Sequence, residues 1–338
     1  MSVRIEPAAL CTALGLLSFV SAGPAAACSV CLAGDPVFSS QGASAQAEGD
    51  VSVYLQLQGW RKTSGSLPHE EHAGEPHEEP AAPDHEHGGD ASESNRSQRL
   101  DLFVSWTPFD RATFTLDLPG AFNRIVEREG EERTRSTLAG FGDASLAGSF
   151  VVWRDRSVLP ATRVEARACV KAPTGRDDVE VDGVRDPHLQ PGTGSWDYGA
   201  GLAVTRRLAR ASLYASVFYR ENTEGALDYE YGDALLANAG LEVPLGHALG
   251  STRLARFTPG FELNFRYAEY DRVDGERFED SGGAIPYATP SLRVQLPELR
   301  AEAPPSLRFA VQIPLTQSWL HAQQREEEVW SVGLLVPF

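Results

Sequence analysis

The chain has 338 residues, 42% of them apolar, and its formal net charge at pH 7 is −17. A balance this acidic argues against nucleic acid as a partner. The apolar residues are spread in short alternating runs. Beyond the N-terminal stretch no window of about 18 uninterrupted apolar residues occurs, so the sequence offers no candidate for a transmembrane helix there.

Residues 1–27 have the pattern of a secretory signal peptide. Arg4 supplies a positive n-region, residues 8–22 form an apolar h-region, and the three alanines at 25–27 form a small-residue cleavage site. The stretch is too short to span a membrane as a helix. It therefore predicts an exported chain, either soluble or a membrane β-barrel.

A short periplasmic segment, residues 28–50, follows the expected cut. Cys28 and Cys31 have CxxC spacing, and Leu32 stands where attachment of a c-type haem would need His. In an oxidising compartment the two cysteines can form a local disulfide. Cys28 directly follows the cut and can instead carry a lipid, although Ala25 stands where a lipobox normally has Leu. Both alternatives stay open.

Residues 51–338 contain twelve segments that alternate as β-strands do. They are 51–60, 98–107, 112–126, 137–153, 161–171, 196–207, 210–220, 234–243, 256–269, 285–296, 306–316 and 329–338. An even number of strands leaves both ends of a single-chain bacterial barrel in the periplasm. Long polar connections follow the odd strands and most of the others are short, although 244–255 and 297–305 are long for inside turns.

Sorting the strands by parity separates an apolar face from a charged face. The outward face carries residues such as Leu55, Leu102, Val217 and Leu263. The inward face carries the residues that we expect to line the lumen: Asp101, Asp117, Asp143, Arg163, Glu165, Arg167, Lys171, Glu242, Glu262, Arg266, Arg293 and Arg308. This pattern predicts an all-β fold, an antiparallel transmembrane β-barrel of about 12 strands with a nearly charge-balanced lumen. Parity alone leaves a soluble two-layer sandwich as the alternative.

The final strand favours the barrel. Its apolar side runs from Trp330 through Val332, Leu334 and Val336 to the terminal aromatic Phe338. We expect such a strand to face membrane lipid and to be the contact with the barrel-assembly machinery. The sequence therefore predicts a location in the bacterial outer membrane.

The connection at residues 61–97 is rich in His and Glu and is expected to be extracellular. Its imidazoles suit Zn or Cu: His69, His72, His77, His85 and His87. Four prolines make a preset metal cage improbable, so any affinity is expected to be modest. Adventitious or buffering metal binding, a selected metal role and a solvated acidic loop all stay open, and no other cofactor is expected.

Catalysis finds little support in the sequence. His188, His247 and His321 fall in connections, and no neighbouring Ser or Asp has a spacing that singles out a triad. We therefore expect no catalytic residues and no enzyme.

Three phrases resemble a known family when taken in order: GFGDASL at 140–146, KAPTGRD at 171–177 and QPGTGSWDYG at 190–199. They are similar to the outer-membrane family named for the MetA pathway of phenol degradation, which is related to fatty-acid-transporter-like barrels. The resemblance covers about residues 98–338. It implies a barrel that passes small, hydrophobic or aromatic molecules.

These observations predict an outer-membrane channel or transporter for small solutes. The alternative is a metal-binding or surface-interaction barrel that uses the His-rich loop and whose lumen is blocked. A lumen of twelve strands is intermediate between filled and open barrels, so strand number alone does not separate the two.

Overall fold

The computed structural model describes residues 48–64, 91–129, 132–156, 161–183, 185–297, 304–321 and 325–338. The signal peptide at 1–27, Cys28, Cys31 and the five histidines predicted to bind metal lie outside the described residues. The fold below therefore concerns the barrel and the connections that close its ends.

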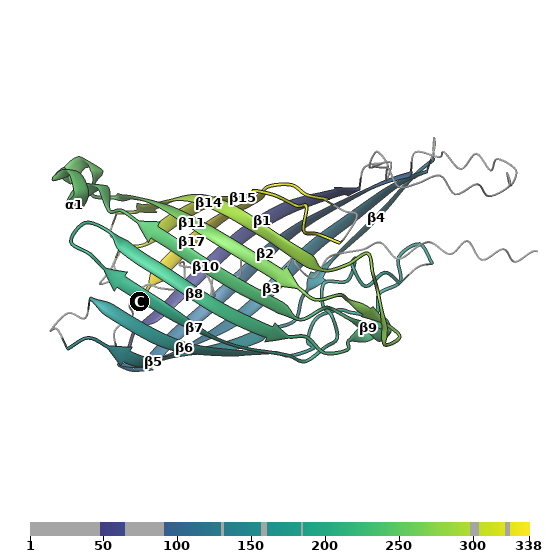
Figure 1. Cartoon of the computed structure of the whole chain (residues 1–338), viewed down its shortest axis with the longest axis horizontal. Coiled ribbons are helices and arrows are strands. Elements are labelled where there is room, and N and C mark those ends of the chain that lie inside the picture. The colour runs from purple at the N-terminus through teal and green to yellow at the C-terminus, as the bar shows by residue number, and fades with distance from the viewer. Residues whose placement is uncertain are drawn as a thin grey trace, which may run out of the picture.

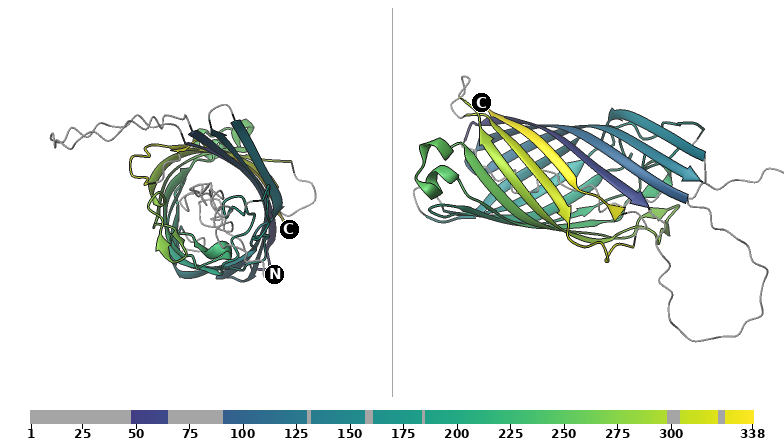
Figure 2. Two further views of the ribbon diagram at one scale, coloured as in Figure 1. Left: turned by 90° about the vertical axis from the view of Figure 1, so that its right-hand side faces the viewer. Right: turned by 90° about the horizontal axis from the view of Figure 1, so that it is seen from above.

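Twelve strands form one closed antiparallel barrel, drawn side-on in Figure 1 and end-on in Figure 2. In chain order they are β1 (Val51–Ser64), β2 (Ala91–Phe109), β3 (Ala112–Glu129), β5 (Ser145–Arg154), β6 (Thr162–Lys171), β7 (Asp197–Arg207), β8 (Ser212–Glu221), β10 (Ala234–Glu242), β11 (Phe257–Ala268), β14 (Gly283–Gln295), β15 (Ser306–Pro314) and β17 (Val329–Pro337). Strand β1 pairs with β2 on one side and with the final strand β17 on the other, which closes the ring.

Short strands and helices lie at the two ends of the barrel. β4 (Glu132–Phe141) continues the line of β5 and pairs with β3, and β16 (Arg325–Glu326) pairs with β1. A small sheet joins β9 (Tyr229–Glu230), β12 (Arg272–Val273) and β13 (Glu276–Arg277). The helical elements are η4 (Ala226–Asp228), α1 (Leu245–Leu249) and η5 (Thr252–Leu254). Among the described residues no helix has the length and apolar content needed to cross a membrane.

The predicted antiparallel barrel of twelve strands is confirmed, with two corrections to its parts. The expected connection at 61–97 is shorter, because residues 61–64 and 91–97 are strand. These residues are mostly polar and lack an apolar face, yet their backbones pair in the β1–β2 ladder. The segment 137–153 is also divided, because residues 142–144 leave the strand between β4 and β5.

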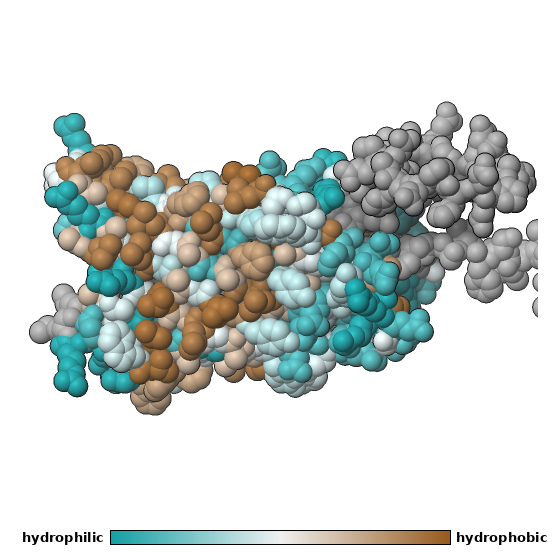
Figure 3. All heavy atoms as spheres, in the orientation of Figure 1, coloured by the Kyte–Doolittle hydropathy of each residue, from teal (hydrophilic) through white to brown (hydrophobic). Residues whose placement is uncertain are grey.

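The outer surface carries a broad apolar band. Opposite one another on β1, β2 and β3 lie the outward side chains of Leu55, Leu102 and Leu118, of which Leu55 and Leu118 are exposed, with similar rows before and after. Figure 3 shows apolar residues in brown across the middle of the barrel and polar residues in teal gathered toward its ends. Exposed aromatic residues, including Trp106, Trp153 and Phe338, lie near one edge. An apolar band of this kind matches the hydrocarbon layer of an outer membrane.

The inner face is polar, so the fold has little of the apolar core that soluble domains use. Gln56, Asp101 and Asp117 are almost fully buried on this face. Within the described residues one small apolar cluster joins Ala268, Ile285 and Tyr287, with Leu320 packed on it. The main stabilising features are therefore the closed backbone ladder and the pairing of inward charges.

Candidate functional site

The inner wall is built from ion pairs that cross between strands. Arg308 on β15 donates hydrogen bonds to Glu242 on β10 (Nη1–Oε1 3.1 Å) and to Glu262 on β11 (Nη2–Oε1 3.3 Å). Arg293 on β14 donates to the second carboxylate oxygen of Glu242 (2.8 Å). Each carboxylate thus faces at least one guanidinium group, which offsets the cost of removing both charges from water.

Two further charged groups lie on the same face of other strands. They are Arg99 with Asp101 and Asp117, and Glu165 with Arg163 (2.7 Å) and Arg167 (3.1 Å). Because cations and anions alternate around the wall, no ring of one sign is formed by these groups. A wall of this kind gives weak charge selectivity.

Aromatic rings lie against glycines on the inner wall. A Cβ atom on Gly333 would come within 2.0 Å of the Tyr54 hydroxyl oxygen, so only glycine leaves room for that ring. Phe218 lies in the same way against Gly199 and Gly201, where added Cβ atoms would meet its ring at 2.5 and 2.7 Å. Because glycine has no side chain, large rings can lie close to the wall at these positions.

Two arginines stack on tyrosines in the lumen. The Cζ atom of Arg266 lies 4.3 Å from the centre of the Tyr287 ring, and that of Arg167 lies 5.7 Å from the Tyr214 ring. Arg266 also lies 3.8 Å from Glu326, whose two carboxylate oxygens are buried and have no hydrogen-bond partner. The wall therefore combines aromatic faces with charge, and both arginine–tyrosine pairs are buried within it.

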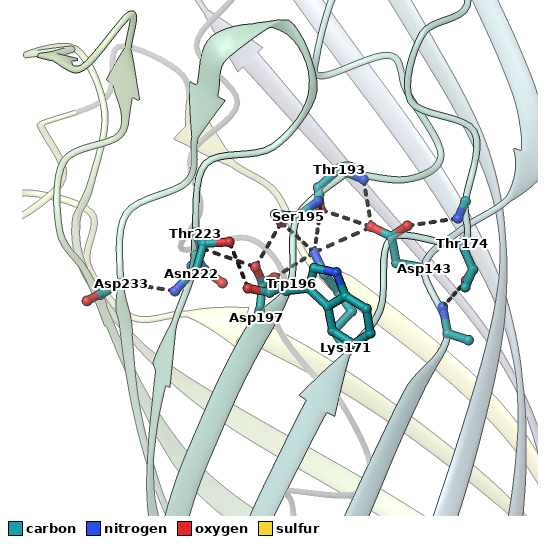
Figure 4. A network of polar contacts seen from close by, with 12 residues as sticks. Asp143, Lys171, Thr174, Thr193, Ser195, Trp196, Asp197, Asn222, Thr223 and Asp233 are labelled. Atoms are coloured by element: carbon teal, nitrogen blue, oxygen red, sulfur yellow. Dashed lines mark hydrogen bonds and ion pairs between the residues drawn. The ribbon is translucent and has the colours of Figure 1, made fainter.

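At the extracellular end, a network of polar side chains joins strands β6 and β7 to the connection between them (Figure 4). Lys171 Nζ lies 2.5 Å from Asp197 Oδ2 and 3.4 Å from Asp143 Oδ2. It also donates to Ser195 Oγ (3.1 Å), which in turn donates to Asp197 Oδ1 (2.8 Å). The backbone N–H of Thr193 donates to Asp143 Oδ2 (2.7 Å). The connection is thus fixed to the rim of the barrel.

Glycines allow this network to be compact. A Cβ atom on Gly175 would lie 2.7 Å from the carbonyl carbon of Gly142, and one on Gly192 would lie 2.8 Å from Asp143 Oδ1. Gly194 has a φ of +74°, which favours glycine. The segments 140–146, 171–177 and 190–199 therefore meet at one place, although their contacting residues are up to 50 residues apart in the chain.

Tyrosines from a second connection pack above the network. Tyr231 donates a hydrogen bond to the carbonyl oxygen of Pro187 (3.3 Å). Tyr229 donates to Asp271 Oδ2 (2.6 Å), and the N–H of Gly232 donates to Asp271 Oδ1 (2.8 Å). Burial raises the pKa of Tyr231 above its ordinary value. Connections 172–196, 222–233 and 269–282 are thus joined by buried hydrogen bonds, and Figure 2 shows teal connecting segments inside the outline of the ring.

In this loop cluster His188 is buried and Asp186 is partly buried, and burial shifts the pKa values of the two groups in opposite directions relative to neutral pH. The His188 ring lies edge-on to Tyr229, with centroids 5.1 Å apart, and burial lowers the pKa of His188 to about 3. Neither ring nitrogen has a hydrogen-bond partner. Burial, reinforced by the charge of Glu127, raises the pKa of Asp186 to about 6. Between about pH 3 and pH 6 both side chains are therefore mainly neutral, whereas at pH 7 His188 stays neutral and Asp186 is mostly ionised.

All twelve residues predicted to line the lumen take part in ion pairs. Three of their partners, Arg99, Asp197 and Glu326, were not predicted from the sequence. Arg99 has the inward parity of Asp101, so the alternation contained a signal for it. Asp197 lies directly opposite Lys171 at the start of β7. Glu326 lies on a two-residue strand whose register no periodic pattern indicates.

The three histidines outside the His-rich loop, His188, His247 and His321, lie in the described ranges. Within them, no group of three or more His, Cys, Asp and Glu side chains is placed to hold an ion. His188 lies in the loop cluster and His247 in α1. The predicted Zn or Cu ligands of the His-rich loop lie outside these ranges, so that site stays a prediction.

Comparison with known proteins gives a likeness in fold. No protein-family model matches the sequence, and no curated protein matches it. The crystal structure of an outer membrane channel from Pseudomonas putida F1 is 14% identical, with a TM-score of 0.58 over 87% of this chain and 97% of that one. The Ralstonia pickettii toluene transporter TbuX is 8% identical, with a TM-score of 0.40 over 87% of this chain and 90% of that one. The first likeness and the closed twelve-strand sheet show that the chain has the fold of an outer-membrane β-barrel.

Proposed function

We propose that the chain is an outer-membrane channel for small solutes. The observation that carries the proposal is the closed barrel whose outer band is apolar and whose inner wall is lined by paired charges and aromatic rings. Paired charges lower the cost of a polar lumen without creating a binding site for one kind of ion. The likeness in fold to a known outer membrane channel supports the same function.

Hydrophobic or aromatic compounds are the solute class that the wall favours. Phe218 and Tyr54 lie against glycines of neighbouring strands, so large rings form part of the inner wall. Phe218 is buried within it and Tyr54 is partly exposed. The guanidinium groups of Arg167 and Arg266 lie near tyrosine rings on the same wall. An aromatic solute that passes the partly exposed ring of Tyr54 can stack on it.

A second function is favoured by the loop cluster at the extracellular end. Buried Tyr229, Leu189 and Asp271 bind the connections together there. If this cluster seals the lumen, the barrel presents its loops to the outside, and the His-rich loop then binds Zn or Cu or a surface partner. In this alternative no solute crosses the barrel.

Conductance and uptake measurements separate the two functions. The channel predicts ion conductance of the purified protein in planar bilayers, with a reversal potential near zero in a salt gradient. It also predicts that Tyr54→Ala slows the uptake of toluene into proteoliposomes several-fold, whereas Val53→Ala, the neighbouring outward residue, leaves uptake unchanged. A barrel that neither conducts nor takes up solute until residues 177–190 are replaced by a short Gly–Ser linker supports the sealed alternative.

A further inference from the structure

Three arginines on neighbouring strands form one row on the outside of the barrel. Arg61 on β1 lies opposite Arg96 on β2, and Arg96 lies opposite Arg124 on β3. They share the parity of the outward residues Leu57 and Leu100. The Cα atoms at the two ends of the row are about 10 Å apart, given the usual spacing of strands. Like charges directly opposite one another destabilise a sheet, so binding of an anionic partner would stabilise this row.

The row lies at the extracellular edge of the apolar band. From Val51 to Arg61 the outward positions on β1 rise by about 24 Å if the strand is tilted by about 45°. This rise matches an apolar band about 25 Å tall. The N–H of Phe338 donates to the carbonyl oxygen of Val51, so the C-terminus marks the opposite, periplasmic end. The guanidinium groups are thus placed at the height of the outer-leaflet headgroups.

The charges of the row are only partly neutralised by the protein. Arg61 donates to Ser94 Oγ (3.2 Å) and lies 3.7 Å from Glu327, with half of its side chain exposed. Arg124 lies with its Cζ atom 5.5 Å from the centre of the Phe122 ring, and its buried Nε atom has no hydrogen-bond partner. Within the described part of the chain, neither Arg96 nor Arg124 forms an ion pair.

The strands that carry the row bear further charges near their extracellular ends. They project beyond the rest of the barrel in Figure 1. On β4, Arg133 and Arg135 are exposed and have the parity of the outward Phe141. Glu127 on β3 has the opposite parity and lies close enough to Asp186, in the loop cluster, to raise its pKa. A chain with a net charge of −17 thus presents a basic outer face where lipid headgroups begin.

We propose that the row Arg61–Arg96–Arg124 binds the phosphate groups of an anionic glycolipid of the outer leaflet, the class to which lipopolysaccharide belongs. A guanidinium group can bind a phosphate through two parallel hydrogen bonds, and three of them in a row can share one or two phosphates. The acyl chains of such a lipid would continue along the apolar band that includes Leu57 and Leu100. This site is independent of whether the lumen conducts.

Native mass spectrometry of the folded protein in zwitterionic detergent tests the proposal, with bis-phosphorylated lipid A as the probe. Replacing the row in R61Q/R96Q/R124Q is expected to weaken binding on the order of 100-fold, because each basic residue near an anionic surface contributes about fivefold. The matched control R206Q/R210Q/R253Q removes three exposed arginines from the periplasmic end and is expected to bind like the unaltered protein. Lipid A without phosphates should bind the unaltered protein as weakly as bis-phosphorylated lipid A binds R61Q/R96Q/R124Q.

Each other outcome overturns the proposal. Equal binding by R61Q/R96Q/R124Q and the unaltered protein would show that the row does not hold the lipid. Displacement of lipid A by an equal concentration of inorganic phosphate would show a site for free anions instead. If the triple variant does not fold, R96Q alone is measured, with an expected loss of about fivefold, and an unchanged affinity contradicts the proposal.

Discussion

The Nζ atom of Lys171 lies 2.5 Å from the Oδ2 atom of Asp197, directly across the pairing of β6 and β7. The same ammonium group lies 3.4 Å from Asp143, so one cation serves two carboxylates that are almost fully buried. Because Asp143 also accepts hydrogen bonds from the connection that follows β6, this cation joins the barrel wall to the loop cluster.

Replacing Lys171 with Met is expected to destabilise the barrel by about 3 kcal/mol, because it leaves two buried carboxylates without their cation. Urea unfolding of the refolded protein in detergent measures the change. The same variant should make residues 172–196 more accessible to protease.

The matched control is Arg154→Met at the periplasmic end. Arg154 donates two hydrogen bonds to Asp110 (2.9 and 2.7 Å), but this pair is exposed to solvent. Its removal is expected to leave stability unchanged within error, because exposed pairs contribute little. Equal losses for both variants would contradict the assigned role of Lys171.

Periodicity predicted the wall of the barrel but not the way its ends close. The two-residue alternation places Leu263 outside and Glu262 inside, whichever strands are neighbours. By contrast, the contact between Asp143 and Thr193 depends on backbone turns at glycines, which carry no periodic signal. Asp271 is fully buried and accepts hydrogen bonds from Tyr229 and Gly232 of another connection, whereas its own sequence context resembles an exposed turn.

The outer face is expected to reject charge while accepting other apolar residues. Leu263 is half exposed in the middle of β11, so Leu263→Arg should destabilise the barrel by about 2 to 4 kcal/mol if the site lies near the bilayer midplane. Leu263→Phe at the same position should fold normally. Refolding into lipid vesicles, followed by heat-modifiable migration in gels, measures both. Equal yields for the two variants would show that this face does not contact lipid.

The loop cluster is expected to respond to pH through two groups of opposite sign. The pKa of Asp186 is raised to about 6, so its stabilising contribution is complete below about 4 and is lost as pH rises through 6. The pKa of His188 is lowered to about 3, so its contribution is present above about 6.5 and is lost as pH falls toward 3. Between pH 4 and 6 the two effects oppose each other, and protection of the loops should change little.

Single variants separate the two groups by the sign of the pH effect. In Asp186→Asn only the histidine titrates, so hydrogen exchange of residues 172–196 should speed up as pH falls from 6.5 to 4, after correction for the intrinsic exchange rate. In His188→Phe only the carboxyl titrates, so the same amides should become better protected from pH 6 to pH 4. His188→Phe removes no hydrogen bond from the ring, because neither nitrogen has a partner. The same pH trend in both variants would contradict this assignment.

The His-rich loop is expected to bind Zn or Cu with modest affinity. Because imidazole coordinates only when neutral, binding should weaken as pH falls through about 6.5. Deleting residues 68–89 should abolish it and leave the barrel folded, since the deletion lies between the ends of β1 and β2. Titration calorimetry of both proteins measures this. Unchanged binding after the deletion would place the site elsewhere, with Cys28 and Cys31 as the next candidates.

The contact between Gly333 and Tyr54 is expected to control closure of the barrel. A Cβ atom at Gly333 would come within 2.0 Å of the Tyr54 hydroxyl oxygen, so Gly333→Ala should push the ring away at the junction of β17 and β1 and lower the yield of folded protein. The double variant Tyr54→Ser/Gly333→Ala should recover folding, because the clash is then absent. Gly148→Ala is the matched control, since its nearest neighbour would be an ordinary 3.6 Å away. A Gly333→Ala protein that folds as well as Gly148→Ala would show that the ring moves freely and that the glycine is not required for closure.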